Sequence, residues 1–322
     1  MSLGAVPTPG SVAMILACRR YYLDGASKSE IALELGISRF KVARLLERAR
    51  REGLVRIEIQ PLPELDLALG DEVARRHGLR GAIVVRTDAD DDQLGLARVG
   101  RAAAAILVDT LDATDVLGVS WGRTLHAMVE HLPRLPACSV VQLVGSVPSL
   151  ELDLNSLELL RRLAQRATGP VHPLHVPLIV DDPETASALR REPHVARTVA
   201  MFDRLTRAIV GIGRWAPAGS TVRAALSPAD AAATDGAGGV ADVCAIVLDA
   251  EGRQVRVAGV PERCLAIRED QLRRVPDVIA VATGTDKVPA IRAALRSGLV
   301  HRLVTDEQAA RRLVDDPREP LA

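Results

Sequence analysis

The chain has 322 residues, of which 48% are hydrophobic, 2% aromatic and 25% charged, so it is long enough for one large domain or two of ordinary size. Its 41 basic and 41 acidic residues cancel, which argues against a protein that binds nucleic acid or a membrane over its whole surface. The four cysteines are widely spaced, which argues against a zinc module or a disulfide framework and favours a reducing compartment.

The first apolar run, from Val12 to Cys18, is too short to span a membrane. It also lacks the preceding positive charge of a signal peptide, so we expect a cytoplasmic protein without a membrane partner. The segment that contains it is basic. Residues 12–60 carry ten Lys or Arg against six Asp or Glu, a net charge of +4, which leaves −4 for the rest of the chain. This asymmetry indicates that the basic end has its own partner.

Three helices are predicted in this basic segment. The first ends near residues 24–25, and its apolar positions are Ile15, Leu16, Tyr22 and Leu23. Ser27 with Glu30 three residues later forms a capping box, which predicts a second helix that runs to residue 35. Gly36 supplies the turn because it tolerates a positive φ, and Ser38 caps the third helix.

The third helix is amphipathic. Its apolar stripe consists of Val42, Leu45, Leu46 and Ala49. Its other side is basic, Gly53 ends it, and residues 55–59 alternate like an edge strand. These elements predict a helix-turn-helix DNA-binding domain over residues 1–60. The candidate DNA-contacting residues are Ser27, Lys28, Ser38, Arg39, Phe40, Lys41, Arg44 and Arg48. Two alternatives stay open: the basic face is only solvated, or Phe40 packs against the domain instead of touching a thymine methyl group.

Residues 60–63 contain two prolines and mark a boundary. The spacing of Leu65, Leu69 and Val73 then predicts a linker helix within residues 61–80, which is the candidate connector between domains. Residues 81–322 show a different pattern, in which apolar strands alternate with small-residue loops and helices. The predicted strands are 82–85, 116–119, 140–144, 208–210, 278–282 and 303–304. This alternation predicts an α/β domain with a parallel sheet covered on both faces, and ligands in such domains bind at the carboxyl ends of the strands.

Two loops at strand ends are able to hold an anion. One is Ser120-Trp121-Gly122-Arg123-Thr124, and the other is Thr283-Gly284-Thr285-Asp286-Lys287. Each would combine a helix N-terminus, hydroxyl groups and a cation. The alternative is that Gly and Thr serve only as helix caps in these loops. Together they indicate a small phosphorylated or otherwise anionic metabolite as ligand.

The chain resembles the SorC family of bacterial sugar-binding transcriptional regulators over nearly its whole length. The similar motifs include Ile37-Ser38-Arg39, residues 118–124 (GVSWGRT), residues 141–145 (VQLVG), residues 211–213 (GIG), residues 239–242 (GVAD), and the segment from Leu272 through Lys287 to Asp306. The resemblance implies a winged-helix-like helix-turn-helix domain joined to a Rossmann-like effector domain related to sugar-phosphate isomerases and deaminases. It also implies a homo-oligomer, either a tetramer or a dimer, that binds operator double-stranded DNA under the control of a sugar or sugar phosphate.

The motif positions that would bind this effector are Gly122, Arg123, Thr124, Gly145, Gly213, Asp242, Gly284 and Lys287. Asp242 would accept hydrogen bonds from sugar hydroxyls. The chain departs from the family at Ala241, where glycine is common, and at Asp286, where glutamate is common.

Two rival functions remain. The first is an isomerase or deaminase that carries a DNA-binding domain, but no HExxH, GxSxG or P-loop pattern is present, and we expect no catalytic residue, metal or cofactor. The HxxH pair formed by His172 and His175 lies in a proline-rich stretch that does not favour a metal site. The second is an architectural DNA-binding protein whose large domain only oligomerises.

Overall fold

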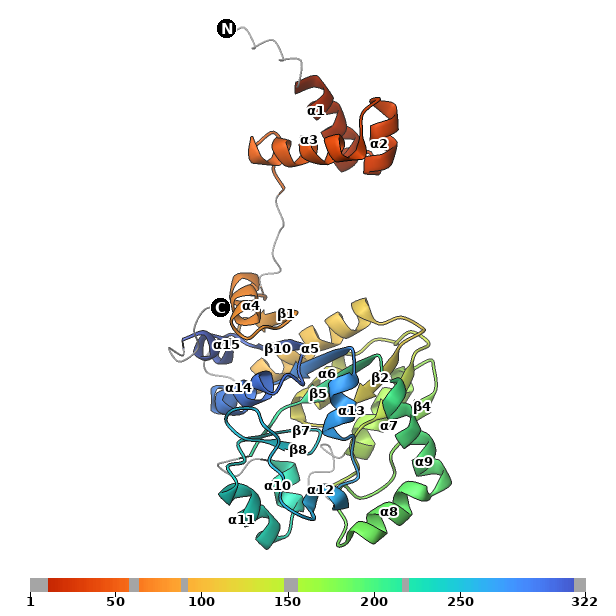
Figure 1. The fold of residues 1–322 in the computed structure, drawn as a ribbon, viewed down its shortest axis with the longest axis vertical. Helices are drawn as coiled ribbons and strands as arrows, with labels where there is room; N and C mark the ends of the chain where they lie inside the picture. Colours follow the sequence, from red (N-terminus) through yellow and green to blue (C-terminus); the bar gives the residue numbers. More distant parts are fainter. Residues whose placement is uncertain (1–10, 58–63, 88–91, 148–155, 216–219, 316–322) are drawn as a thin grey trace. The chain divides into compact units, whose positions relative to one another are not determined.

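The computed structural model describes residues 11–57, 64–87, 92–147, 156–215 and 220–315. The chain forms two compact units, Met1–Pro61 and Leu62–Ala322, which are described separately (Figure 1). The predicted linker helix is α4, Leu67–Arg76, and it packs on strand β1 and helix α15 of the second unit. The predicted boundary at residues 60–63 lies outside the described residues.

The small unit is helical. Its elements are α1 Ser11–Cys18, the π-helix η1 Arg19–Leu23, α2 Lys28–Glu34 and α3 Arg39–Arg51. The capping box is confirmed: the Ser27 hydroxyl accepts from the Glu30 N–H at 3.3 Å, and the Glu30 carboxylate accepts from the Ser27 N–H at 2.7 Å. The Ser38 hydroxyl caps α3 by accepting from the Lys41 N–H at 3.2 Å. Gly36, with φ of +63°, makes the turn between α2 and α3.

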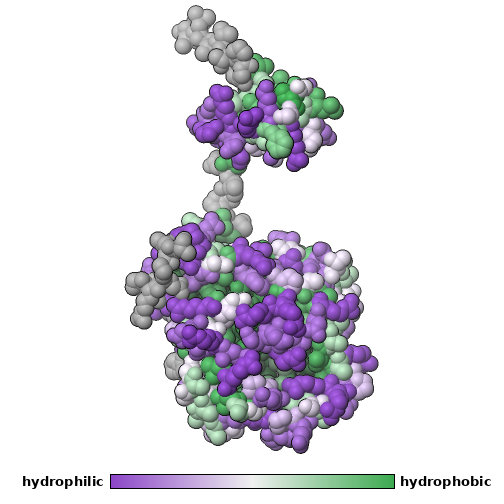
Figure 2. All heavy atoms as spheres, in the orientation of Figure 1, coloured by the Kyte–Doolittle hydropathy of each residue, from purple (hydrophilic) through white to green (hydrophobic). Residues whose placement is uncertain are grey.

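The core of the small unit confirms the predicted stripe of α3 and corrects the predicted face of α1. Its buried residues are Met14, Ala17, Cys18, Ile31, Val42, Leu46 and Ala49. The prediction for Ile15, Leu16 and Leu23 was wrong, because they lie on the exposed side of α1 and η1. Figure 2 shows hydrophobic patches among the hydrophilic surface of this unit. The strand predicted over residues 55–59 is also wrong for 55–57, and residues 58–59 lie outside the described chain.

The large unit is built on a seven-stranded parallel sheet with the order β1-β10-β9-β5-β2-β3-β4. Its strands are β1 Gly81–Val85, β2 Val116–Val119, β3 Ser139–Gln142, β4 Val171–His172, β5 Arg207–Gly211, β9 Asp277–Val281 and β10 Arg302–Asp306. The predicted parallel α/β fold is therefore confirmed. A second sheet, which is antiparallel, was not predicted. It consists of β6 Gly213–Arg214, β7 Ala241–Val243 and β8 Ile246–Leu248.

Both faces of the large sheet are covered by a hydrophobic core. Successive residues of a strand point to opposite faces, so one strand contributes side chains to both cores. In β5, Ile209 joins one hydrophobic core while Ala208 and Val210 join the other. The first core holds residues of α5 Asp92–Thr110, α6 Arg123–His131 and α7 Ser156–Arg166. The second holds residues of α4, α14 Val288–Arg296 and α15 Glu307–Val314. The other helices are α8 Pro183–Arg191, α9 Pro193–Ala200, η3 Met201–Arg204, α10 Thr221–Ala225, α11 Pro228–Gly236, α12 Val260–Arg263, α13 Glu269–Arg274 and η4 Thr285–Lys287.

One local prediction at the end of the sheet was wrong. The spacing of Thr305 and Gln308 in the sequence predicts a capping box that opens the last helix, but Thr305 lies within β10 and is fully buried. Asp306 is the cap of α15, since its carboxylate accepts from the Ala309 N–H at 2.9 Å. Its other carboxylate oxygen accepts from the Gly284 N–H at 2.7 Å. Asp306 therefore ties α15 to the loop that follows β9.

The strand order changes direction between β2 and β5. The chain runs from β2 outward to β3 and β4, then returns to place β5 on the other side of β2. The loops that leave the carboxyl ends of β2 and β5 consequently diverge, which opens a crevice at a topological switch point. The predicted anion-holding loop at residues 120–124 is the loop that follows β2.

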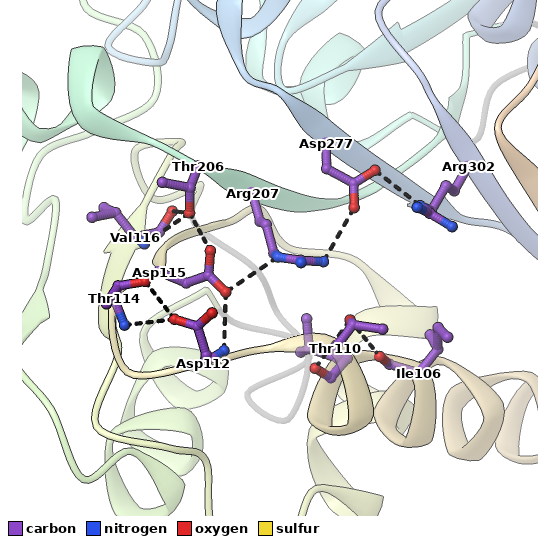
Figure 3. A network of polar contacts seen from close by, with 11 residues as sticks. Ile106, Thr110, Asp112, Thr114, Asp115, Val116, Thr206, Arg207, Asp277 and Arg302 are labelled. Carbon is purple, nitrogen blue, oxygen red and sulfur yellow. Dashed lines mark hydrogen bonds and ion pairs between the residues drawn. The ribbon is translucent and has the colours of Figure 1, made fainter. Parts of the chain in front are cut away.

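The amino ends of the strands are joined by a polar network (Figure 3). Arg207 pairs with Asp115 at 3.2 Å and with Asp277 at 3.2 Å, and Asp277 also pairs with Arg302 at 3.0 Å. The Thr206 hydroxyl donates to Asp115 at 2.6 Å. The network crosses the four adjacent strands β2, β5, β9 and β10. Within it, each of the two largely buried carboxylates has a counter-charge or a hydrogen-bond donor, as burial of a charge requires. It lies at the end of the sheet opposite to the crevice.

Candidate functional site

Two adjoining cavities lie at the carboxyl ends of the strands. The first cavity, about 100 Å³, is lined by the loops after β2 and β5 and by β7. The second cavity, about 460 Å³, is lined by the loops after β1 and β9 and by the start of α5 and α15. The residues common to both linings are Arg123, Thr124, Arg214 and Lys287. Of the eight predicted effector residues, six line the first cavity: Gly122, Arg123, Thr124, Gly213, Asp242 and Lys287.

Asp242 is the buried carboxylate of the first cavity. It is only 7% exposed, and its Oδ1 accepts from the Ser220 hydroxyl at 2.6 Å. Burial raises the pKa of Asp242, whereas the bond from Ser220 and the charge of Lys287 oppose that rise. Gly213 makes room for this side chain, because a Cβ on Gly213 would lie 2.1 Å from Oδ1 of Asp242. The missing side chain of Gly213 therefore leaves space for the Asp242 carboxylate and not for a ligand.

Lys287 is the ammonium group shared by the two cavities. Its Nζ donates to the Ile212 carbonyl at 3.1 Å. Burial lowers the pKa of Lys287, the nearby Arg123 guanidinium lowers it further, and the carboxylates of Asp286 and Asp242 oppose the shift. Among the described residues the ammonium group has one hydrogen-bond partner, a neutral carbonyl, and it lies near other cations, so it is suited to receive an anion.

Arg123 and Thr124 open helix α6 at the boundary of the cavities. Gly122, with φ of +146°, is the N-cap residue and has no side chain with which to cap the helix. The first-turn N–H groups of α6 are thus available to an anion, and the helix dipole favours negative charge at this end. Arg123 is exposed, and within the described part of the chain it has no ion-pair partner.

Arg214 is a functional candidate that the sequence analysis missed. It follows Gly213 in β6, lines both cavities, and pairs with Asp286 through Nη1 and Oδ2 at 2.9 Å. Its position directly after a glycine-rich strand-end loop is the signal that could have revealed it. Thr221 and Cys244 also line the first cavity and were not singled out.

The turn between β7 and β8 forms part of the first cavity wall. Cys244 and Ala245 both have positive φ, +52° and +64°, in a two-residue hairpin that glycine or asparagine usually occupies. Such a backbone costs on the order of 1–2 kcal/mol per residue. Burial raises the pKa of the Cys244 thiol, which disfavours its thiolate form.

The remaining predicted residues lie elsewhere. Gly284 lines only the second cavity, and its φ is +98°. Gly145 lines neither cavity, and its close packing explains the glycine, because a Cβ would lie 2.7 Å from the Pro177 carbonyl oxygen. Trp121 lines the first cavity and also contacts both hydrophobic cores; its indole Nε1 has no hydrogen-bond partner among the described residues.

On the small unit, the predicted DNA-contacting residues lie along α3 and at the start of α2. Those of α3 are all exposed: Arg39, Phe40, Lys41, Arg44 and Arg48. Phe40 is 80% exposed, so the alternative in which it packs against the domain was wrong.

The basic side chains of this surface differ in their partners. Arg48 pairs with Glu52 at 2.6 Å, and the Lys28 ammonium lies 5.8 Å from the centroid of the Tyr21 ring. No ion-pair partner of Arg39, Lys41 or Arg44 is found within residues 11–57, which leaves their charges available to phosphates. None of the described helices is long and apolar enough to cross a bilayer.

Comparison with known proteins identifies the family of the chain. A family model described as "Putative sugar-binding domain" matches residues 63–315. The chain is 32% identical to the "Uncharacterized transcriptional regulator YjhU" of Escherichia coli K12, over 90% of each chain, and 28% identical to the "Sorbitol operon regulator" of Klebsiella pneumoniae, over 91% of this chain and 95% of the relative. The solved full-length SorC of Klebsiella pneumoniae superposes with a TM-score of 0.73 at 26% identity, covering 96% of this chain and 100% of that one. These relatives are named as regulators and not as enzymes. The chain belongs to the SorC family of sugar-binding transcriptional regulators.

Proposed function

We propose that the small unit binds operator DNA and that an anionic sugar, most simply a sugar phosphate, controls this binding from the two cavities of the large unit. The observation that supports it best is the group of cations common to both cavities, Arg123, Arg214 and Lys287, of which only Arg214 pairs with a carboxylate in the described structure. Sugar hydroxyls would reach Asp242 and Ser220 in the first cavity, while the anionic group would lie among the cations.

For the DNA contact, the N-terminal half of α3 would enter the major groove. Arg39, Lys41 and Arg44 would supply the charged contacts there, and Ser27 and Lys28 at the start of α2 would approach the phosphate backbone. One helix-turn-helix makes too few contacts for high specificity, so we propose that the protein works as a homodimer or homotetramer in the cytoplasm.

The proposed coupling between the two sites runs through α15 and α4. Asp306 binds the cavity loop at Gly284 and caps α15, and the Arg76 guanidinium of α4 donates to the Val314 carbonyl at the end of α15. Helix α4 is the first helix of the large unit after the small unit. If effector binding favours one arrangement of these helices, it changes operator affinity by the same factor by which DNA changes effector affinity.

A thermal-shift screen against sugar phosphates, the matching free sugars and polyols tests this function. A ligand present at 100 times its Kd is expected to stabilise the protein by about 2.7 kcal/mol. The expected result is stabilisation by a phosphorylated sugar that also shifts operator binding in a gel or anisotropy titration. Stabilisation by free sugars alone would contradict the role given to the cations, and the absence of any effect on operator binding would contradict the coupling.

Arg44→Ala is expected to weaken operator binding by about 1–3 kcal/mol and to reduce the slope of log K against log salt by about 1 if Arg44 contacts a phosphate. The measurement is operator affinity by anisotropy at several salt concentrations. Arg51→Ala is the matched control, because it removes the same charge from the last turn of the same helix. Equal loss in both variants would show that only the net charge of α3 matters.

A further inference from the structure

The three cations common to both cavities are held in different ways. Lys287 donates to a neutral carbonyl, that of Ile212, at 3.1 Å, and Arg123 has no ion-pair partner among the described residues. Arg214 alone is held by a carboxylate, with 2.9 Å between its Nη1 and Oδ2 of Asp286. Asp286 therefore already forms an ion pair with one of the cations that an anionic ligand would contact.

The loop that carries Asp286 is shaped to direct its carboxylate toward Arg214. A Cβ on Gly284 would lie 2.6 Å from Oδ1 of Asp286, so the side chain folds back over a position that only glycine leaves open. The Gly284 N–H in turn donates to Asp306, which fixes the loop. The pairing of Asp286 with Arg214 thus depends on a specific backbone arrangement.

The ion pair between these residues is also exposed enough to exchange partners. The side chain of Arg214 is 25% exposed and that of Asp286 is 53% exposed. Pairs with this exposure contribute little to stability because water solvates both charges. A phosphate dianion offers Arg214 a bidentate, charge-assisted contact and is also attracted by Arg123 and Lys287, so it can replace a single carboxylate.

We propose that Asp286 is a resident counter-ion of Arg214 that the anionic group of the effector must displace. This inference rests on the proposed function, since it concerns the same cavities. It adds a basis for specificity: a neutral sugar leaves the Arg214–Asp286 pair in place, whereas a phosphorylated sugar breaks it and releases Asp286 toward the solvent. Asp286 is then a positioning and selecting residue that lowers the affinity for weak anions.

A double-mutant cycle with inorganic phosphate as the probe tests the proposal in the full-length protein. The four proteins are the wild type, Asp286→Asn, Arg214→Gln and the double variant, and the measurement is phosphate affinity by calorimetry. Asp286→Asn is expected to tighten binding about twofold to fivefold, because the competing carboxylate is gone while its shape is kept. Arg214→Gln is expected to weaken binding about tenfold or more. In the Arg214→Gln background, Asp286→Asn should then have no effect.

The cycle separates the outcomes. An equal gain from Asp286→Asn in both backgrounds would overturn the proposal, because Asp286 would then act only through its charge at a distance. No gain in either background would overturn it as well, while leaving the proposed function intact. Failure of all four proteins to bind phosphate would overturn both the proposal and the anionic effector. If Arg214→Gln does not fold, Arg214→Met supplies the background without the guanidinium charge, and Asp286→Asn should again have no effect in it.

Discussion

Lys287→Met is expected to lower the affinity for the anionic effector by about 10- to 100-fold and to abolish the effector response, while operator binding stays within about twofold of wild type. A charge-assisted hydrogen bond to a ligand typically contributes about 1.5–3 kcal/mol, which gives this range. Lys287 lies in both cavities, and its burial removes much of the water that would otherwise solvate the ammonium group. Methionine keeps the length of the side chain and removes the charge.

Folding should survive this change. The Lys287 ammonium is desolvated and has one carbonyl partner, so replacing it with an apolar side chain of similar size is expected to leave the Tm unchanged or to raise it. The measurements are effector affinity by calorimetry, operator affinity by anisotropy, and thermal unfolding. A fall in Tm with parallel loss of both affinities would instead show that Lys287 is structural.

Lys41→Met is the matched control, because Lys41 carries the same side chain on the exposed face of α3. It should give the reverse pattern, with weaker operator binding and unchanged effector affinity.

The pH dependence of effector binding adds a second readout for Lys287. The pKa of Lys287 lies below the ordinary lysine value of 10.5, so its charge is lost at a lower pH than that of a solvated lysine. Effector affinity should therefore fall with rising pH before pH 10.5 is reached, and Lys287→Met should remove this fall.

Gly213→Ala is expected to destabilise the protein by about 1–3 kcal/mol, which for a unit of this size lowers the Tm by roughly 2–10 °C, and to weaken effector binding as well. The added Cβ would lie 2.1 Å from Oδ1 and 2.6 Å from Cγ of Asp242. Either β6 or the buried carboxylate must move, and movement of Asp242 breaks its bond from Ser220. A buried carboxylate without its donor is costly, which adds to the steric term.

Gly81→Ala is the control for this prediction. Gly81 also begins a strand, but its added Cβ would meet only the Arg302 guanidinium, at 3.7 Å, which is ordinary van der Waals contact. Its Tm and effector affinity should stay close to the wild-type values. Thermal unfolding and calorimetry measure both quantities. An unchanged effector affinity in Gly213→Ala would mean that Asp242 does not touch the ligand.

Local signals in the sequence predicted the small unit well. The capping box of Ser27 and Glu30, the cap at Ser38 and the turn at Gly36 each involve residues within four positions of one another. Hydrogen bonds of this kind form largely independently of the rest of the chain, so their residue types identify them directly. The face of α1 was mispredicted, because which of two apolar stripes is buried depends on where α2 and α3 pack.

In the large unit, the sequence pattern was sufficient to predict six of the seven parallel strands and the loops at their carboxyl ends, whereas the two-residue strand β4 was not predicted. Buried apolar runs that alternate with amphipathic helices permit few other folds, and the connections between parallel strands place those loops on one edge. Arg123, Thr124 and Lys287 were identified because they fall in the loops that follow predicted strands. The structure brings these three side chains together in the linings of two adjoining cavities.

Which groups meet across that edge could be read from the folded structure alone. The pairing of Arg214 with Asp286, the fit of Asp242 against Gly213 and the tie from Asp306 to Gly284 each join residues of different loops or strands. Strands β6, β7 and β8 are two or three residues long, too short to give a periodic pattern. Their pairing brings Asp242 into the first cavity. Sequence periodicity records which face of an element is buried, whereas contacts between distant residues follow from strand order and register, which are fixed only when the whole sheet assembles.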